Sequence, residues 1–170
     1  TLKDRLARAA KLLQAQPNLH TYVPFTPVPC GLAVQGGYDC AFPSGGAIRR
    51  VCKTIGVDSF DLVLIDDPKL LGVLRYVDYK KLVYRPTDIY SQMGLKNWRL
   101  LESHLIEQCD AVVATSGPVL KFLNETFAHE KPGKVFVNGV DYDLFSQPQA
   151  KPAEYTGARK RCVYVGILDF

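Results

Sequence analysis

The chain has 170 residues, of which 47% are hydrophobic and 22% are charged, and its formal net charge is +4. A chain of this length buries roughly two-thirds of its unfolded surface, so a folded domain with a full core is expected. The small, interspersed charge excludes the dense basic stripe of a nucleic-acid binder. No apolar run approaches the ~18 to 20 residues of a membrane span, and with no signal-peptide pattern we expect a cytoplasmic protein.

The first predicted element is an amphipathic helix over residues 2–13. Its basic residues Lys3, Arg5, Arg8 and Lys11 cluster beside apolar positions that include Leu6. Such a helix usually packs its apolar side on a sheet and keeps its charges in water. The alternative is a peripheral, salt-sensitive contact with an anionic membrane surface. A strand over residues 19–25 is expected next.

A loop rich in Pro and Gly covers residues 26–46 and leads into a helix that carries Arg49 and Arg50. Loops of this length inside compact domains are usually functional. Gly45 and Gly46 at its end could hold an anion through backbone N–H groups and the helix dipole, with arginine adding charge. Ordinary helix capping by Ser44 explains the same residues.

Four apolar runs follow, at residues 61–65, 81–84, 111–114 and 134–137, and each except the last precedes a helical pattern. Their near-continuous apolar character indicates strands buried on both faces. Helices between strands indicate a parallel sheet built from right-handed crossovers. The expected fold is α/β, with a doubly wound, mostly parallel, Rossmann-like sheet.

Polar residues follow these strands at the edge where such sheets bind ligands. Asp88, after the second run, stands where a catalytic base would stand, although an Asp before a helix is commonly an N-cap. Asp67 precedes Pro68 and is expected to cap a helix, which leaves Asp66 available to a ligand. Ser116, after the third run, could contact a ligand or serve as a cap.

Apolar residues at spacings of three and four mark the buried face of a long helix: Leu95, Trp98, Leu101, Leu105 and Cys109. Glu102 and Glu107 are assigned to its solvated face. The five cysteines are odd in number and widely spaced, which predicts neither a zinc site nor a disulfide framework. The three histidines are equally scattered, so no metal site is expected.

Together these segments resemble a known enzyme family. The matching stretches are Leu82-Val83-Tyr84-Arg85-Pro86-Thr87-Asp88, then Glu102 leading to Cys109-Asp110-Ala111-Val112-Val113-Ala114-Thr115-Ser116, then Asn138-Gly139-Val140-Asp141 and Val163-Tyr164-Val165-Gly166. The pattern resembles the GT-B glycosyltransferases, and within them most the bacterial exopolysaccharide enzymes of the xanthan glucuronosyltransferase type. The Tyr-Arg-x-x-Asp element is the most selective part, and its Asp is the catalytic base of the resembled enzymes.

The resemblance implies an inverting, metal-independent transfer of a sugar, with glucuronic acid the candidate, from a UDP-sugar to a lipid-linked glycan. Asp88 would be the base, and Asp66, Arg85, Ser116, Gly45 and Gly46 would bind substrate. No cofactor is implied, because helix N-termini and basic groups would neutralise the pyrophosphate charge. The setting would be bacterial surface polysaccharide synthesis, at the inner face of the cell membrane.

The resemblance also implies two Rossmann-like domains that face a cleft. Residues 1–146 would form the acceptor-side domain, 147–160 a linker and 161–170 the first strand of the nucleotide-sugar domain. The chain would then be cut, and by itself it should not turn over.

Two other classes of function compete with this interpretation. In a non-catalytic sugar- or anion-binding module, Asp88 would only be a cap. A Rossmann oxidoreductase is disfavoured, because no Gly-x-Gly-x-x-Gly follows a predicted strand. The fold class alone does not separate these functions.

Overall fold

A computed structural model of the chain describes residues 12–25, 45–92 and 97–148. The chain divides into two compact units, Thr1–Asn138 and Gly139–Phe170. The first unit holds the sheet and is described below. In the second, the described part is α6 (Tyr142–Ser146), a short helix whose N-cap Asp141 accepts a hydrogen bond from the Leu144 N–H.

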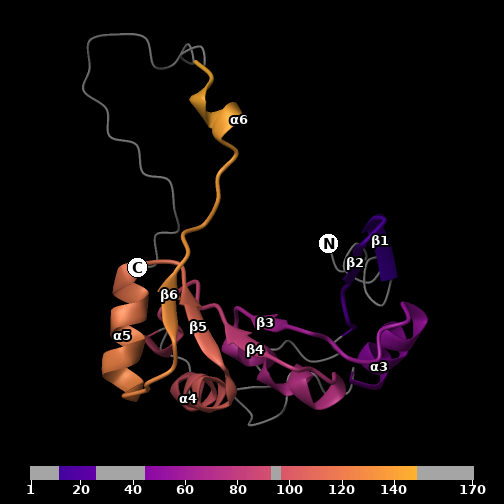
Figure 1. The fold of residues 1–170 in the computed structure, drawn as a ribbon, viewed down its shortest axis with the longest axis horizontal. Coiled ribbons are helices and arrows are strands. Elements are labelled where there is room, and N and C mark those ends of the chain that lie inside the picture. Colours follow the sequence, from indigo (N-terminus) through magenta and orange to yellow (C-terminus); the bar gives the residue numbers. More distant parts are fainter. Residues whose placement is uncertain (1–11, 26–44, 93–96, 149–170) are drawn as a thin grey trace. The chain divides into compact units, whose positions relative to one another are not determined.

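A four-stranded parallel sheet forms the centre of the first unit (Figure 1). Its strands are β3 (Val63–Ile65), β4 (Leu82–Tyr84), β5 (Ala111–Ala114) and β6 (Gly133–Val135), and they lie in sequence order across the sheet. The crossovers contain the 3-10 helices η1 (Pro68–Tyr76) and η2 (Tyr90–Gln92) and the α-helices α4 (Trp98–Gln108) and α5 (Gly117–Phe127). The expected α/β class is confirmed. Strand β5 has the predicted bounds, β3 and β4 begin later than predicted, and β6 begins one residue and ends two residues earlier.

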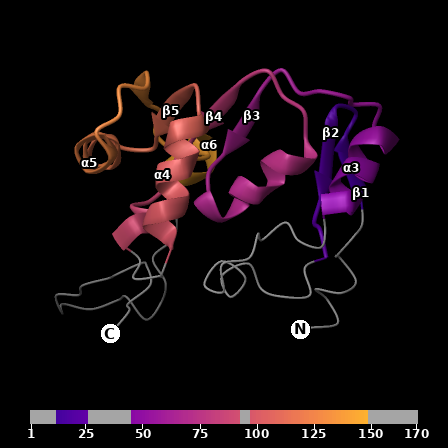
Figure 2. The same ribbon diagram turned by 90° about the horizontal axis from the view of Figure 1, so that it is seen from below.

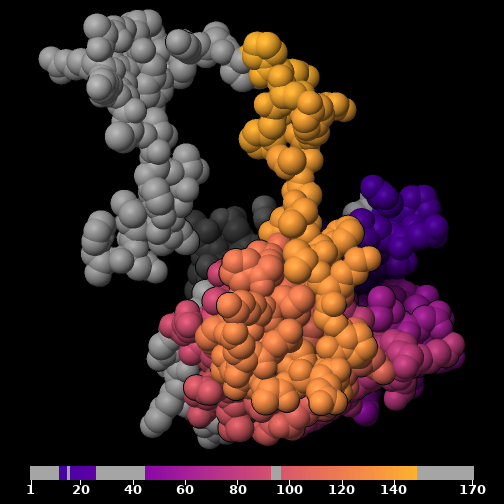
Figure 3. Space-filling view, turned by 60° about the vertical axis from the view of Figure 1, so that its left-hand side comes forward, coloured from indigo at the N-terminus to yellow at the C-terminus, as the bar shows by residue number. Residues whose placement is uncertain are grey.

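The core lies on one face of this sheet. Alternate strand residues Leu82, Tyr84, Val112 and Ala114 are fully buried, and they pack with side chains of α4 and α5 in one cluster. Right-handed crossovers that advance in one direction across a sheet place their helices on the same side. Figure 2 shows α4 in front of β4 and β5, and Figure 3 shows the outer surface of α5.

The expectation that the strands are buried on both faces is wrong for β3 and β6. Leu64 in β3 is 50% exposed, all three residues of β6 are exposed, and the adjoining Phe136 is 66% exposed. The one-sided placement of the helices explains the exposure of Leu64, because its side chain alternates with the buried Ile65. An apolar run therefore predicted the strands but not how many of their faces are covered.

The N-terminal part of the described chain is a hairpin. Strands β1 (Leu12–Gln16) and β2 (Leu19–Tyr22) pair antiparallel, and the Gln14 side chain donates to the Pro17 carbonyl at 2.8 Å. The predicted helix is therefore wrong at its end, residues 12 and 13, where strand pairing satisfies the backbone instead. Its residues 1–11, with the basic cluster, lie outside the described residues. The predicted strand from residue 19 is confirmed over its first four residues.

Helix α3 (Gly45–Thr54) carries Arg49 and Arg50 as predicted. Gly45 and Gly46 belong to its first turn, so the predicted loop ends earlier than residue 46. Its remaining residues, 26–44, lie outside the described residues. Arg49 donates to the Arg75 carbonyl at 3.1 Å and lies over the Tyr76 ring, which holds α3 against η1.

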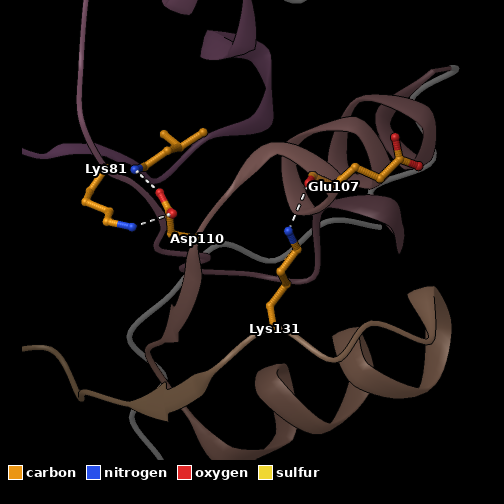
Figure 4. Close-up of polar contacts among 5 residues, drawn as sticks. Lys81, Glu107, Asp110 and Lys131 are labelled. Atoms are coloured by element: carbon orange, nitrogen blue, oxygen red, sulfur yellow. Dashed lines mark hydrogen bonds and ion pairs between the residues drawn. The ribbon is translucent and has the colours of Figure 1, made fainter.

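Paired charges secure the amino-terminal edge of the sheet (Figure 4). Asp110 accepts from the Leu82 N–H at 2.8 Å and from Lys81 Nζ at 3.0 Å. Lys131 Nζ donates to the Glu107 carbonyl near the end of α4, at 3.0 Å, while the Glu107 carboxylate points away from it. A cation at a helix C-terminus is favourable because it meets the negative end of the dipole.

Candidate active site

The candidate site lies at the opposite, carboxyl-terminal edge of the sheet, where parallel strands deliver their following loops to the same side. The loop after β4, residues 85–92, is called the Asp88 loop here. Thr115, directly after β5, anchors it: the Thr115 N–H donates to the Pro86 carbonyl at 3.2 Å, and its hydroxyl lies 3.3 Å from the carbonyls of Pro86 and Thr87. Loops of adjacent strands are thus joined beside Asp88.

Asp88 lies at the outer surface of this loop. The residue is exposed, and its carboxylate makes no hydrogen bond or ion pair with any described residue. The alternative role as an N-cap is therefore not observed, since η2 begins after it without a side-chain cap. Within the described part of the chain, its oxygens are left available to a ligand.

The charges of three carboxylates act on Tyr90, at the start of η2. Burial is the main cause that raises the pKa of Tyr90, and the charges of Asp67, Asp66 and Asp88 raise it further, while a hydrogen bond with Thr87 lowers it. The structure thus brings Asp66 and Asp88 to the same part of the edge, although they are far apart in the sequence.

Asp67 has the capping role that the sequence pattern predicted. Asp67 caps η1: its Oδ1 accepts from the Lys69 N–H at 2.9 Å, and its Oδ2 lies 3.0 Å from Lys69 Nζ. Asp66 is exposed, and no described residue bonds its side chain. The predicted cap is confirmed, and Asp66 remains open to a ligand.

Arg85 and Ser116 lie at the same edge with their polar groups in use. The Arg85 guanidinium donates to Asn138 Oδ1 at 2.6 Å, a bond that joins the end of β4 to the segment after β6. Ser116 caps α5, where its Oγ accepts from the Val119 N–H at 3.4 Å. The capping interpretation of Ser116 is thereby observed. Ligand contacts by Arg85 and Ser116 remain predictions.

Gly45 and Gly46 are not part of this group. Gly45 is buried against the ring of Tyr76, so close that a Cβ there would lie 2.1 Å from ring atoms. Tyr76 is the last residue of η1, at the opposite end from the cap Asp67. The close approach explains why glycine is needed at position 45 without any anion. Anion binding by these glycines remains a prediction.

A buried polar pair beneath the Asp88 loop was missed by the sequence interpretation. Tyr84 and Glu102 are both 0% exposed, and Tyr84 Oη donates to Glu102 Oε1 at 2.6 Å. The assignment of Glu102 to a solvated face is therefore wrong, whereas Glu107 is exposed as expected. Spacing could have found it, because Glu102 continues the series Trp98, Leu105 and Cys109 at intervals of four, three and four.

Burial dominates the electrostatics of this pair. It raises the pKa of Glu102, and the hydrogen bond from Tyr84 and the influence of Ser91 oppose the shift. Burial also raises the pKa of Tyr84, and the Glu102 charge adds to that effect. The neutral forms of both groups are thus favoured in the core.

The described residues contain no group of three or more His, Cys, Asp or Glu side chains placed to hold a metal ion. Cys109 is buried and Cys52 half-buried, each as a free thiol. Within residues 12–25, 45–92 and 97–148, every helix is too short or too polar to traverse a bilayer.

The fold and this edge define an α/β domain whose loops meet at the carboxyl ends of a parallel sheet. Among solved structures it is similar to a sucrose-phosphate synthase from Thermosynechococcus elongatus, with a TM-score of 0.57 and 13% sequence identity, over 79% of this chain and 72% of that one. At this identity the similarity shows the fold. No family model matches the chain, and neither does any curated protein.

Proposed function

We propose that the chain is the acceptor-side domain of a GT-B glycosyltransferase and that Asp88 is its catalytic base. One observation carries the proposal: an exposed carboxylate that no described residue bonds lies at the carboxyl edge of the sheet, on a loop that its neighbours anchor. The similarity of fold to a sucrose-phosphate synthase, itself a GT-B glycosyltransferase, supports the class of enzyme only.

In the proposed reaction, Asp88 accepts the proton of an acceptor hydroxyl while that oxygen attacks the anomeric carbon of a nucleotide-sugar. The bond between sugar and nucleoside diphosphate breaks, so the sugar is transferred with inversion. Asp66 and Arg85 would orient the acceptor hydroxyls at the same edge. Positioned general bases of this kind contribute roughly 100- to 10,000-fold to rates.

The finer features of the proposal come from the sequence resemblance. They are a UDP-sugar donor, glucuronic acid as the transferred sugar, and a lipid-linked glycan acceptor in bacterial exopolysaccharide synthesis at the cytoplasmic face of the membrane. The donor nucleotide would be held without a metal by a second domain, which residues 161–170 would begin, after a linker at 147–160. The domain arrangement is part of the proposal.

Replacing Asp88 by Asn tests the role of base, because Asn keeps the shape and removes the proton acceptor. In the two-domain enzyme, with UDP-glucuronic acid and a lipid-linked oligosaccharide, UDP release should fall about 100-fold or more. The thermal midpoint should not change, since the Asp88 carboxylate contacts no described residue. Asp110→Asn is the matched control at the other edge, and it should leave UDP release unchanged.

Near-normal turnover by Asp88→Asn would exclude Asp88 as the base. Retained sugar binding without any turnover by the wild type would instead favour the alternative of a non-catalytic module.

A further inference from the structure

Glu102 lies directly beneath the Asp88 loop, in the apolar core. Its Oε1 accepts the 2.6 Å hydrogen bond from Tyr84, the last residue of β4, which precedes the Asp88 loop. No cation pairs with this carboxyl among the described residues. Stability alone favours an apolar side chain here, because burying a carboxyl has a desolvation cost that one hydrogen bond offsets only in part.

The second oxygen of this carboxyl has no such bond. Ser91, three residues after Asp88, acts on Glu102 and lowers its pKa. Among the described residues, however, neither Ser91 Oγ nor Glu102 Oε2 has a hydrogen-bond partner. The bond from Tyr84 therefore ties Glu102 to the start of the Asp88 loop.

Two further contacts hold the loop around Asp88 without using its carboxylate. Thr87 and Tyr90, on either side of it, share a hydrogen bond of 2.5 Å between their hydroxyls. The Tyr90 ring stacks on Trp98, with ring centroids 5.4 Å apart, and Trp98 lies one turn before Glu102 on α4. The loop backbone is thus tied to α4, while the Asp88 carboxylate keeps its acceptor capacity.

We propose that Glu102 is a positioning residue, which holds the start of the Asp88 loop through Tyr84 so that the Asp88 carboxylate meets the acceptor hydroxyl. This inference rests on the proposed function of Asp88. Displacement of a reacting group by about 1 Å costs up to 100-fold in rate, so a support of this kind matters even though Glu102 touches no substrate.

Two substitutions separate positioning from simple packing. Glu102→Gln keeps an oxygen that accepts from Tyr84. Glu102→Leu fills the same space and removes the bond from Tyr84. Glu107→Gln, on the exposed side of the same helix, is the matched control.

The first measurement is amide hydrogen exchange in the 170-residue chain. The amides of Thr115 and Gln92 report on the loop, because they bond the carbonyls of Pro86 and Ile89. In Glu102→Leu their exchange should quicken roughly threefold to tenfold, because the loss of one buried hydrogen bond lowers the free energy of local opening by a corresponding amount. The amide of Phe136, which bonds the Ala114 carbonyl in the neighbouring strands, should not change. Glu102→Gln and Glu107→Gln should leave all three rates near those of the wild type.

The second measurement is steady-state UDP release by the two-domain enzyme, with UDP-glucuronic acid and a lipid-linked oligosaccharide. Glu102→Leu should lower kcat about 10- to 100-fold while the donor KM stays unchanged. Glu102→Gln should restore kcat to within a few fold. A merely structural residue would change the thermal midpoint without this split between kcat and KM.

The proposal is overturned if folded Glu102→Leu leaves the Thr115 and Gln92 amides and kcat unchanged, or if the Phe136 amide quickens equally. Should Glu102→Leu not fold, Tyr84→Phe replaces it with the same expected exchange pattern. The two proposals fail separately: an active Asp88→Asn enzyme removes the base, whereas the exchange pattern still decides whether Glu102 holds the loop.

Discussion

The two edges of the sheet differ in how many of their carboxylates are bonded within the described structure. At the amino edge, Asp110 is bonded by Lys81 and by the Leu82 N–H, and Lys131 bonds the last turn of α4. At the carboxyl edge, Asp66 and Asp88 are exposed and bond no described residue. Both edges carry carboxylates that hold the fold, Asp110 at the amino edge and the cap Asp67 at the carboxyl edge, but Asp66 and Asp88 take no part in this.

The difference indicates which carboxylates stabilise the domain and which are available to bind a ligand. A carboxylate that is already hydrogen-bonded has little acceptor capacity left for a substrate, so unpaired groups are expected where chemistry occurs. Support for the carboxyl edge is buried instead, in the pair of Tyr84 and Glu102 beneath the loop. Substitutions at the buried pair, at the cap of α5 and at the amino edge test these roles separately.

The largest effect on stability is expected from Tyr84→Phe. The substitution removes the donor to Glu102 and leaves a buried carboxyl without its best partner, at a cost of about 1–3 kcal/mol in the free energy of unfolding. Urea unfolding measures this. Tyr142→Phe is the control, because Tyr142 is 75% exposed and should give no measurable change. Equal stability of the two variants would mean that the Tyr84 bond contributes nothing to the fold.

A smaller effect is expected from Ser116→Ala, which removes the cap of α5 and should cost about 0.5–1 kcal/mol, since the observed bond of 3.4 Å is long. Ser116→Asp restores an acceptor at the cap and should recover the loss. If Ser116 only caps α5, UDP release per folded molecule stays at the wild-type level in Ser116→Ala. A specific loss of turnover would add Ser116 to the substrate-binding group at the carboxyl edge.

The smallest effect is a change in how stability depends on pH, and its sign should differ between the amino edge and the buried pair. The hydrogen bonds from Leu82 and Lys81 lower the pKa of Asp110 from its ordinary value of 3.8. Its contribution to stability is therefore present above pH 3.8 and is lost as the pH falls through the lower, folded-state pKa. Asp110→Asn should melt slightly below the wild type at neutral pH, and the difference should vanish in acid.

Glu102 should behave in the opposite way, because burial raises its pKa above 4.5. The stability that its neutral form provides is complete below pH 4.5 and is lost as the pH rises through the folded-state pKa. The thermal midpoint of Glu102→Gln, measured relative to that of the wild type, should therefore increase as the pH rises. Differential scanning calorimetry from pH 3 to 8 checks both variants, and parallel trends would contradict the contrast.

Local patterns predicted much of the carboxyl edge. The caps at Asp67 and Ser116 and the strand ends before Asp66 and Asp88 depend on interactions within a few residues, and the structure has them as predicted. The sequence interpretation placed Asp88 correctly after a strand. It could not predict that the Asp88 carboxylate bonds no described residue, because the capping alternative fits the same residues.

By itself, the sequence determined the α/β class, the four strands and their order along the chain, because apolar periodicity and capping are short-range effects. Only the tertiary structure decided that α4 and α5 cover the same face of the sheet, that residues 12 and 13 join a strand, and that Glu102 is buried. These outcomes depend on which distant segments pack together. A glutamate on a helix is buried at a tolerable cost only when a partner from another element, here Tyr84 of β4, bonds its carboxyl. A local sequence pattern does not show which distant residue will be that partner.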